Sequence, residues 1–269
     1  MSTKRYEKTF TELKEKNEGA FIPFVVLGDP DFETSKEILE TMAKHADCLE
    51  LGFPFSDPIA DGKRIQAADE RALNTKMNYE KCFELIKEVR EKNPDLPIGL
   101  LLYYNLVYTN GVESFLKNAK ESGVDGILIA DMPIEESNEI QELCNKFDLE
   151  QIFIIAPTTG KERMKKILSK AKGFVYTVSV TGVTGERQNV KDSTITLVKQ
   201  IKEFAKIPIC VGFGVSEPAH VKKILTAGAD GAICGSAVET IIEKNLDNKS
   251  TMLKELDLFF EGMKKATKK

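Results

Sequence analysis

Short runs of consecutive apolar residues alternate with amphipathic stretches along almost the whole chain. The runs are rich in Ile, Val, Leu and Phe, which is typical of parallel strands that are covered on both faces. The stretches between them carry apolar residues at helical spacing, as at Cys82, Phe83, Ile86 and Val89. A further helix is expected ahead of the first strand, from residue 6 to residue 16. The expected strands are residues 21–27, 48–52, 97–103, 126–130, 152–156, 174–178, 207–211 and 231–234.

A short segment recurs where a helix ends and a strand begins. Residues 122–127 (Ser-Gly-Val-Asp-Gly-Ile) and 227–232 (Ala-Gly-Ala-Asp-Gly-Ala) are alike, and residues 45–49 form a degenerate third copy. Two copies place glycine where the C-terminus of a helix favours it. Eight such helix–strand units predict the α/β class, as a closed (β/α)8 TIM barrel with an extra N-terminal helix. No linker or low-complexity stretch divides the chain, so residues 1–269 are expected to form a single domain.

The composition narrows the classes of function. The chain has 269 residues, a net charge of −4 and no basic stripe, which argues against a nucleic-acid partner. It lacks a run of about 18 apolar residues, so we expect no membrane span. The first residues are charged, and none of the five cysteines forms a Cys-x-x-Cys pair, so we expect a cytoplasmic location. The two histidines, His45 and His220, are expected to be exposed; with no His/Cys cluster we expect no catalytic metal.

Catalytic groups in such a barrel lie at the carboxyl ends of the strands, and Glu50 stands near the end of the second strand. Alternation places it on the opposite face from Leu49 and Leu51. If the leucines face the helices, Glu50 points into the barrel mouth, where burial raises the pKa of a carboxyl and suits it to proton transfer. The alternative is a structural Glu that pairs with a cation.

The loop after this strand, residues 53–62, contains Asp61. Asp61 precedes a helical stretch, so it is either an N-cap or a residue of the site. Phe53 and Phe55 are unusual on a Pro-bounded loop, and they indicate a substrate wall or a partner surface.

Glycine-rich segments follow the seventh and eighth strands, at Gly212 and Gly214 and at Gly235 and Ser236. Barrels commonly bind phosphate at these two strand ends through backbone N–H groups. The alternative is a tight turn without a ligand. The polar, glycine-bearing segment 179–189 after the sixth strand is interpreted as a mobile lid.

Five segments resemble the α subunit of tryptophan synthase, and the similarity runs in register from about residue 6 to the final helix. They are residues 50–58 (Glu-Leu-Gly-Phe-Pro-Phe-Ser-Asp-Pro), 60–62 (Ala-Asp-Gly), 129–133 (Ile-Ala-Asp-Met-Pro), 182–185 (Gly-Val-Thr-Gly) and 212–214 (Gly-Phe-Gly).

The resemblance implies retro-aldol cleavage of indole-3-glycerol phosphate to indole and D-glyceraldehyde 3-phosphate. It implies that Glu50 transfers protons at indole C3 and the glycerol hydroxyl, and that Asp61 binds the indole N–H. The implied substrate contacts are Phe24, Leu101, Tyr103, Leu128, Ala130, Ile154, Tyr176, Thr184 and Phe213. The implied phosphate contacts are Gly185, Gly212, Gly214, Gly235 and Ser236.

The resemblance also implies a partner, a β subunit in an α-β-β-α heterotetramer, which receives the indole and makes L-tryptophan. Residues Pro54, Ser56 and Asp57 would face it. The pyridoxal phosphate cofactor would belong to that partner, and none is expected in this chain. Lys63-Arg64 departs from the family pattern and puts positive charge near the partner-facing side. Val26 departs as well, since a hydroxyl residue is expected there.

Three alternatives stay open at this stage, and the first is another phosphate-handling barrel, either an epimerase or an aldolase. A sugar-phosphate epimerase would want metal ligands, and a Schiff-base aldolase would want a Lys inside strand 152–156 or 174–178, where there is none. A chain that mainly activates a partner is disfavoured by the presence of both Glu50 and Asp61. A stand-alone lyase that releases free indole is not separated from the subunit by sequence.

Overall fold

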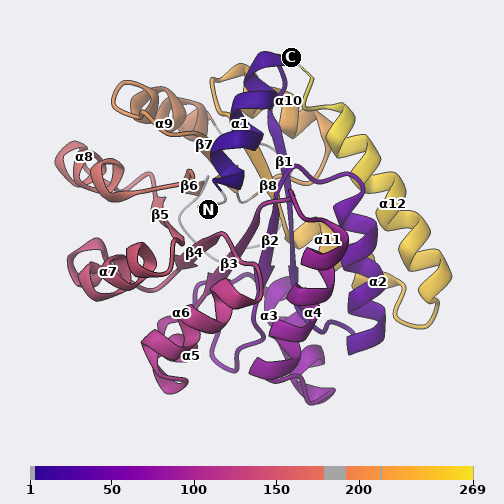
Figure 1. Ribbon diagram of the computed structural model, residues 1–269. Helices are drawn as coiled ribbons and strands as arrows, with labels where there is room; N and C mark the ends of the chain where they lie inside the picture. Colours follow the sequence, from indigo (N-terminus) through magenta and orange to yellow (C-terminus); the bar gives the residue numbers. More distant parts are fainter. Residues whose placement is uncertain (1–3, 179–191, 213, 269) are drawn as a thin grey trace.

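The computed structural model describes residues 4–178, 192–212 and 214–268. Within this part of the chain, eight parallel strands form a closed barrel in which each strand pairs with the next and β8 pairs with β1 (Figure 1). All eight predicted strands are confirmed, with ends that differ by no more than two residues. The strands are β1 (Ala20–Val26), β2 (Leu49–Gly52), β3 (Ile98–Leu102), β4 (Gly126–Ile129), β5 (Glu150–Ile155), β6 (Val175–Val178), β7 (Ile209–Gly212) and β8 (Gly231–Cys234).

Helices surround the barrel (Figure 1). In α4 the predicted apolar face, which includes Cys82, Phe83 and Ile86, is buried. The predicted helix ahead of the first strand is also confirmed. The helices are α1 (Arg5–Glu15), α2 (Phe32–Ala43), α3 (Lys63–Asn74), α4 (Tyr79–Lys92), α5 (Tyr104–Thr109), α6 (Val112–Glu121), η1 (Ile134–Glu136), α7 (Asn138–Lys146), α8 (Lys161–Lys170), α9 (Asp192–Lys202), α10 (Pro218–Thr226), α11 (Ser236–Lys244) and α12 (Lys249–Lys265).

Successive side chains along the strands belong alternately to two apolar layers. Leu49 and Leu51 are fully buried in the layer that β2 shares with the outer helices, where Leu39 of α2 also lies. Leu128 and Tyr176 belong to a second cluster in the barrel interior. Because successive side chains of a strand point to opposite faces, Glu50 points inward between the two leucines. The expectation for this side chain is therefore confirmed.

Helix α1 closes the barrel at the amino ends of the strands. Tyr6 is 1% exposed, and its ring meets that of Phe174 edge-on at 5.5 Å between centroids. The Tyr6 hydroxyl lies 2.6 Å from the place where a Cβ on Gly99 would stand, so a larger residue there would collide with it. With this end filled, the carboxyl ends of the strands are the side of the barrel at which a substrate can enter.

The repeated helix–strand segment of the sequence has a structural counterpart. In each copy an aspartate carboxylate accepts the backbone N–H of a residue in the preceding strand, and the aspartate N–H is donated back to the carbonyl of that same residue. The carboxylate distances are 2.8 Å for Asp47 with Phe21, 2.9 Å for Asp125 with Ile98 and 3.0 Å for Asp230 with Ile209. The return distances are 3.0, 2.8 and 2.7 Å. The repeat therefore fastens β1 to β2, β3 to β4 and β7 to β8.

Each of these aspartates also meets a cation, but the surroundings differ. Asp125 is 4% exposed and lies between Arg5 and Arg90, at 2.7 and 2.8 Å. Asp230 is more open and pairs with the exposed Lys202 at 3.2 Å. Removing the carboxylate from a buried ion pair costs far more than doing so at the surface.

We predict that Asp125→Ala lowers the free energy of unfolding by about 3–5 kcal/mol, because two arginines and the Ile98 N–H lose a buried acceptor. Asp230→Ala should cost about 1–2 kcal/mol. Asp95→Ala, which removes an exposed partner of Lys8, is the control and should change stability by less than about 1 kcal/mol. Urea unfolding measures all three, and equal losses for Asp125 and Asp95 would contradict the fastening role.

Candidate active site

The carboxyl ends of the strands gather most of the predicted substrate residues. Tyr176 and Leu128 lie in the interior cluster, and Leu101, Ala130 and Ile154 pack against it from β3, β4 and β5. Phe24 of β1 is 6% exposed, and its ring passes within 3 Å of the Cβ positions of Gly52 and Gly235. Thr184, Gly185 and Phe213, together with the lid segment 179–189, lie outside the described residues.

Glu50 is a buried carboxyl that is not paired with a cation in the described part of the chain. It is 3% exposed, and its Oε2 atom has no hydrogen-bond partner among the described residues. Burial and, to a smaller extent, the charge of Asp61 together raise the pKa of Glu50 to about 8. The structural alternative, a Glu that pairs with a cation, is thereby contradicted within the described residues. A carboxyl with a pKa near neutrality suits proton transfer.

Asp61 is not the N-cap of α3. That position belongs to Gly62, and α3 begins at Lys63. The Asp61 carboxylate instead accepts the Tyr103 hydroxyl, at 2.7 Å between Oη and Oδ2. Burial raises the pKa of Asp61, and the hydrogen bond from Tyr103 lowers it. Burial and the same bond raise the pKa of the Tyr103 phenol, so it remains a donor. The cap interpretation was therefore wrong.

The two phenylalanines of the loop have different places. Phe53 is 5% exposed and packs against Phe83 and Phe115, at 5.1 and 5.6 Å, so it belongs to the core under α4 and α6 rather than to a substrate wall or a partner surface. Phe55 stacks on Tyr103, with 5.0 Å between ring centroids and 25° between planes. Phe53 was thus misassigned, while Phe55 lies beside the Asp61 site.

The partner-facing segment is only partly exposed. Pro54 is buried in the isolated chain, whereas Ser56 and Asp57 are exposed. Ile59 is 79% exposed, the largest fraction among the exposed large apolar side chains of the described residues. The surface that a partner can reach on this loop therefore begins after Pro54 and includes an apolar side chain that the sequence argument did not single out.

The glycines at the ends of β7 and β8 leave space for a ring, allow a left-handed backbone conformation and precede a helix. The Tyr176 hydroxyl lies 2.1 Å from the place of a Cβ on Gly212, so glycine there leaves room for that ring. Gly214 has a φ of 73°, which favours glycine. Gly235 is the N-cap residue of α11, whose first residue is Ser236. The N-terminus of a helix favours anions, and this one begins directly at the end of β8.

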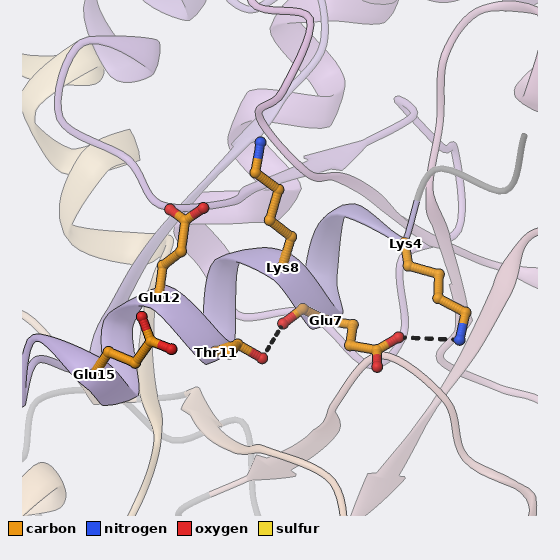
Figure 2. Close-up of a pocket in the computed structure, with 6 residues that line it drawn as sticks. All are labelled: Lys4, Glu7, Lys8, Thr11, Glu12 and Glu15. Carbon is orange, nitrogen blue, oxygen red and sulfur yellow. Dashed lines mark hydrogen bonds and ion pairs between the residues drawn. The ribbon is translucent and has the colours of Figure 1, made fainter.

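Two hollows differ in place and in chemistry. The larger, about 400 Å³, lies along the outer face of α1 at the closed end of the barrel. Figure 2 shows that its side chains spread along the helix without converging on one point: Lys4, Glu7, Lys8, Thr11, Glu12 and Glu15. The smaller, about 240 Å³, adjoins Ala130 and Ile154 at the carboxyl ends of β4 and β5. We place the site at the second end, because the carboxyl groups of Glu50 and Asp61 are there.

Arg64 pairs with Glu243 of α11, and the positive charge of Lys63-Arg64 near the partner-facing side stays a prediction. One expectation about a charged side chain is wrong. His220 is 3% exposed, not exposed as expected. Its Nδ1 atom accepts the Ser216 N–H at 3.3 Å in the loop after β7.

Among the described residues no group of three or more His, Cys, Asp or Glu could hold a metal ion. No described helix is long and apolar enough to cross a membrane.

Sequence reasoning missed several buried ionisable residues behind the site. Asp69 of α3 is 4% exposed, and Asp29 at 1% is held by Arg71 through two 2.7 Å hydrogen bonds. Glu239 of α11 is fully buried and accepts the Val26 N–H at 3.0 Å. Helical spacing was the available signal for Asp69, because Ile65, Ala68 and Ala72 share its buried face.

A closed barrel with one buried and one half-buried carboxyl group at the carboxyl ends of its strands is an arrangement suited to an enzyme that transfers protons. The family described as tryptophan synthase alpha chain matches residues 10–268. The chain belongs to the tryptophan synthase alpha chain family, a family of lyases.

Its relatives match over nearly the full length. The alpha chain of Methanocaldococcus jannaschii is 54% identical, over 88% of this chain and 84% of that protein. The alpha chain of Vibrio parahaemolyticus is 47% identical, over 98% of this chain and 99% of that protein. A solved structure from the α2β2 complex of Pyrococcus furiosus tryptophan synthase is 38% identical with a TM-score of 0.86, and the match covers 92% of this chain and 98% of that chain. Family membership removes the epimerase and Schiff-base aldolase alternatives.

The raised pKa of Glu50 predicts a pH-dependent stability. The folded state keeps a proton on Glu50 that the unfolded state releases above about pH 4.5, so this group's contribution to stability falls as the pH rises toward 8. Glu50→Gln removes this loss of stability at high pH, because glutamine carries no titrating proton. It should stabilise the protein little at pH 5 and by up to about 5 kcal/mol at pH 9.

Thermal and urea unfolding at both pH values measure the effect. Glu70→Gln, on the exposed face of α3, is the control and should show the same small difference at both pH values. A stabilisation by Glu50→Gln that does not change with pH would contradict the raised pKa.

Proposed function

We propose that Glu50 and Asp61 carry out the reaction of this family, the retro-aldol cleavage of indole-3-glycerol phosphate to indole and D-glyceraldehyde 3-phosphate. The observation that carries the proposal is the pair of carboxyl groups at the mouth, Glu50 buried and Asp61 half-buried. The Oε2 atom of Glu50 has no hydrogen-bond partner among the described residues, and Asp61 is held by Tyr103. The charge of Asp61 also raises the pKa of Glu50, which places the two groups within electrostatic reach of one another.

Glu50 begins the cycle as an acid. Because its pKa is about 8, it is mostly protonated at neutral pH and donates this proton to C3 of the indole ring. The ring then carries a positive charge that is shared with N1. When the bond between C3 and the side chain breaks, its electrons return to the ring and the adjacent hydroxyl becomes the aldehyde. The Glu50 carboxylate takes the hydroxyl proton, so the residue ends the cycle as it began.

Asp61 supports the charged intermediate. Its Oδ2 atom is occupied by the Tyr103 hydroxyl, so we assign the indole N–H to Oδ1. A fixed carboxylate in a partly water-excluded site stabilises developing positive charge better than water does. The pKa of Asp61 is raised by burial, and Tyr103 offsets part of that rise. This helps to keep the group ionised while it lies beside the ring.

The rest of the mouth supplies binding. We assign the indole ring to Phe24, Leu101, Leu128, Ala130 and Ile154, and the glycerol chain to the neighbourhood of Tyr176. We assign the phosphate to backbone groups of Gly212, Gly214, Gly235 and Ser236, supported by the start of α11 at this place. Thr184, Phe213 and Gly185 complete the assignments, although they lie outside the described residues.

We further propose that the chain works with a β subunit in an α-β-β-α assembly and passes indole to it. The Pyrococcus furiosus relative comes from such an α2β2 complex, which favours the subunit over a stand-alone lyase. Ser56, Asp57 and Ile59 are exposed on the loop that carries Asp61, so docking there would restrain a site residue directly. Pyridoxal phosphate would belong to the β subunit. A single domain and a cytoplasmic location fit the continuous barrel and the five free, buried cysteines.

We predict that Asp61→Asn and Glu50→Gln each lower turnover by about 10²–10⁴-fold, the range for acid–base groups. The Asp61 effect is informative because Gly62, not Asp61, caps α3, so the loss cannot come from the helix. Indole release from indole-3-glycerol phosphate measures both, and circular dichroism checks the fold. Near-normal turnover in either variant would refute that residue's role.

We predict that Ile59→Asp weakens binding of the β subunit at least tenfold. Ile59 is 79% exposed in the isolated chain, so the change should leave stability unaltered. Leu258→Asp on α12, where the leucine is 58% exposed, is the matched control. Calorimetric titration with the β subunit of a close relative compares the two. Equal affinities would show that the partner does not use this loop.

A further inference from the structure

Asp69 has a buried carboxyl group on the inner face of α3. It shares that face with Ile65, Ala68 and Ala72, all of which are buried. It is 4% exposed, and its Oδ2 atom has no hydrogen-bond partner among the described residues. The pKa of Asp69 is raised to about 8, chiefly by burial and also by the charges of Asp61 and Asp29, while the hydrogen bond from the Phe55 N–H lowers it. An apolar residue would fit such a position at lower cost, so packing does not account for a carboxylate here.

The contact that Asp69 makes is with the loop that carries Asp61. Its Oδ1 atom accepts the backbone N–H of Phe55, at 3.2 Å. This bond crosses from the second turn of α3 to the beginning of the loop between β2 and α3. It therefore fixes the backbone from which the Phe55 ring projects.

The Phe55 ring in turn fixes the tyrosine that holds Asp61. It stacks on Tyr103 at 5.0 Å, and the Tyr103 hydroxyl donates to Asp61 Oδ2 at 2.7 Å. The same hydroxyl oxygen accepts the Ala60 N–H at 3.0 Å, so Tyr103 joins β3 to the loop at two neighbouring residues. Asp69, Phe55, Tyr103 and Asp61 thus form one continuous series of contacts.

A second side chain of α3 reaches the loop, but from the solvent side. Gln66 Nε2 donates to the Asp61 carbonyl at 2.8 Å, and Gln66 is exposed. Water competes more strongly for the exposed hydrogen bond of Gln66 than for the bond of Asp69, which is part-buried and comes from a side chain that is 4% exposed. Of the two, Asp69 is the contact that holds the ring beside the tyrosine.

We propose that Asp69 is a positioning residue for Asp61, which it orients through the Phe55 backbone and the Tyr103 ring. The proposal rests on the proposed role of Asp61 in the lyase reaction. Asp69 itself does not contact substrate. Its loss should lower kcat and leave KM nearly unchanged, because the phosphate end of the site on β7 and β8 has no part in this series of contacts. A misplaced catalytic group typically costs up to about 100-fold.

The test compares Asp69→Leu with Asp69→Asn. The leucine keeps approximately the volume but removes the acceptor, and we expect kcat to fall by about 10- to 100-fold with KM within about twofold. The asparagine keeps an oxygen that can accept the Phe55 N–H, so its kcat should stay within about threefold of the parent chain. Glu70→Leu, the neighbouring exposed position, is the control and should leave kcat unaltered. A normal kcat in Asp69→Leu, or an equal loss in both Asp69 variants, overturns the proposal.

A double-mutant cycle tests the route. If Asp69 acts through Tyr103, then Asp69→Leu should cost less than about threefold in a Tyr103→Phe chain, whereas independent effects would multiply. Phe55→Leu keeps the backbone bond but removes the stacked ring, so it should lower kcat and also be non-additive with Tyr103→Phe. If Asp69→Leu does not fold, Phe55→Leu takes its place in the cycle with Tyr103→Phe. If the losses of kcat multiply in the double variants, the proposed route from Asp69 through Phe55 and Tyr103 to Asp61 is overturned.

Asp61→Asn, assayed alongside, separates the two claims. If Asp61→Asn is inactive and Asp69→Leu is fully active, the positioning role fails and the function of Asp61 stands. If Asp61→Asn retains normal turnover, the proposed role of Asp61 fails, and the positioning role fails with it.

Discussion

The structure depends on keeping one carboxyl group, that of Glu50, inside the barrel without a cation beside it in the described residues. Burial of such a group is unfavourable. The fold holds the carboxyl of Glu50 in the interior on a short buried strand, with a leucine on either side of it in the sequence. Leu49 and Leu51 pack outward into the helix layer, which forces Glu50 inward. Tyr6 and the rest of α1 fill the opposite end, so the stabilising core lies below the site and the mouth remains for chemistry.

The second carboxyl is held in a different way, and this difference matters for function. Asp61 lies on a loop, not on a strand, and its place is set by contacts with Tyr103 of the neighbouring β3–α5 connection. A loop residue held by such contacts can respond to what docks on the same loop, whereas Glu50 is fixed by the barrel. Partner binding to Ser56, Asp57 and Ile59 would therefore act on the charge-stabilising group and leave the proton-transfer group in place.

The sequence predicted those features that depend on local order. Apolar runs located all eight strands, and alternation along residues 49–51 placed Glu50 correctly. The contact between Tyr103 and Asp61 could not be predicted from local sequence patterns. The two residues are 42 positions apart, and only the closed barrel brings them together. Local rules also misassigned Asp61 as a possible N-cap, since Gly62 takes that position. Phe53 was misassigned because a loop residue that packs under two helices carries no periodic signal.

The central claim is that Glu50 is protonated at neutral pH because it is buried. Its carboxyl can be titrated directly by carbon-13 NMR in protein labelled at glutamate Cδ, with Glu50→Gln used to assign the resonance. The account predicts a midpoint near 8 for this carboxyl, well above that of the exposed glutamates. A midpoint near the ordinary 4.5 would contradict it.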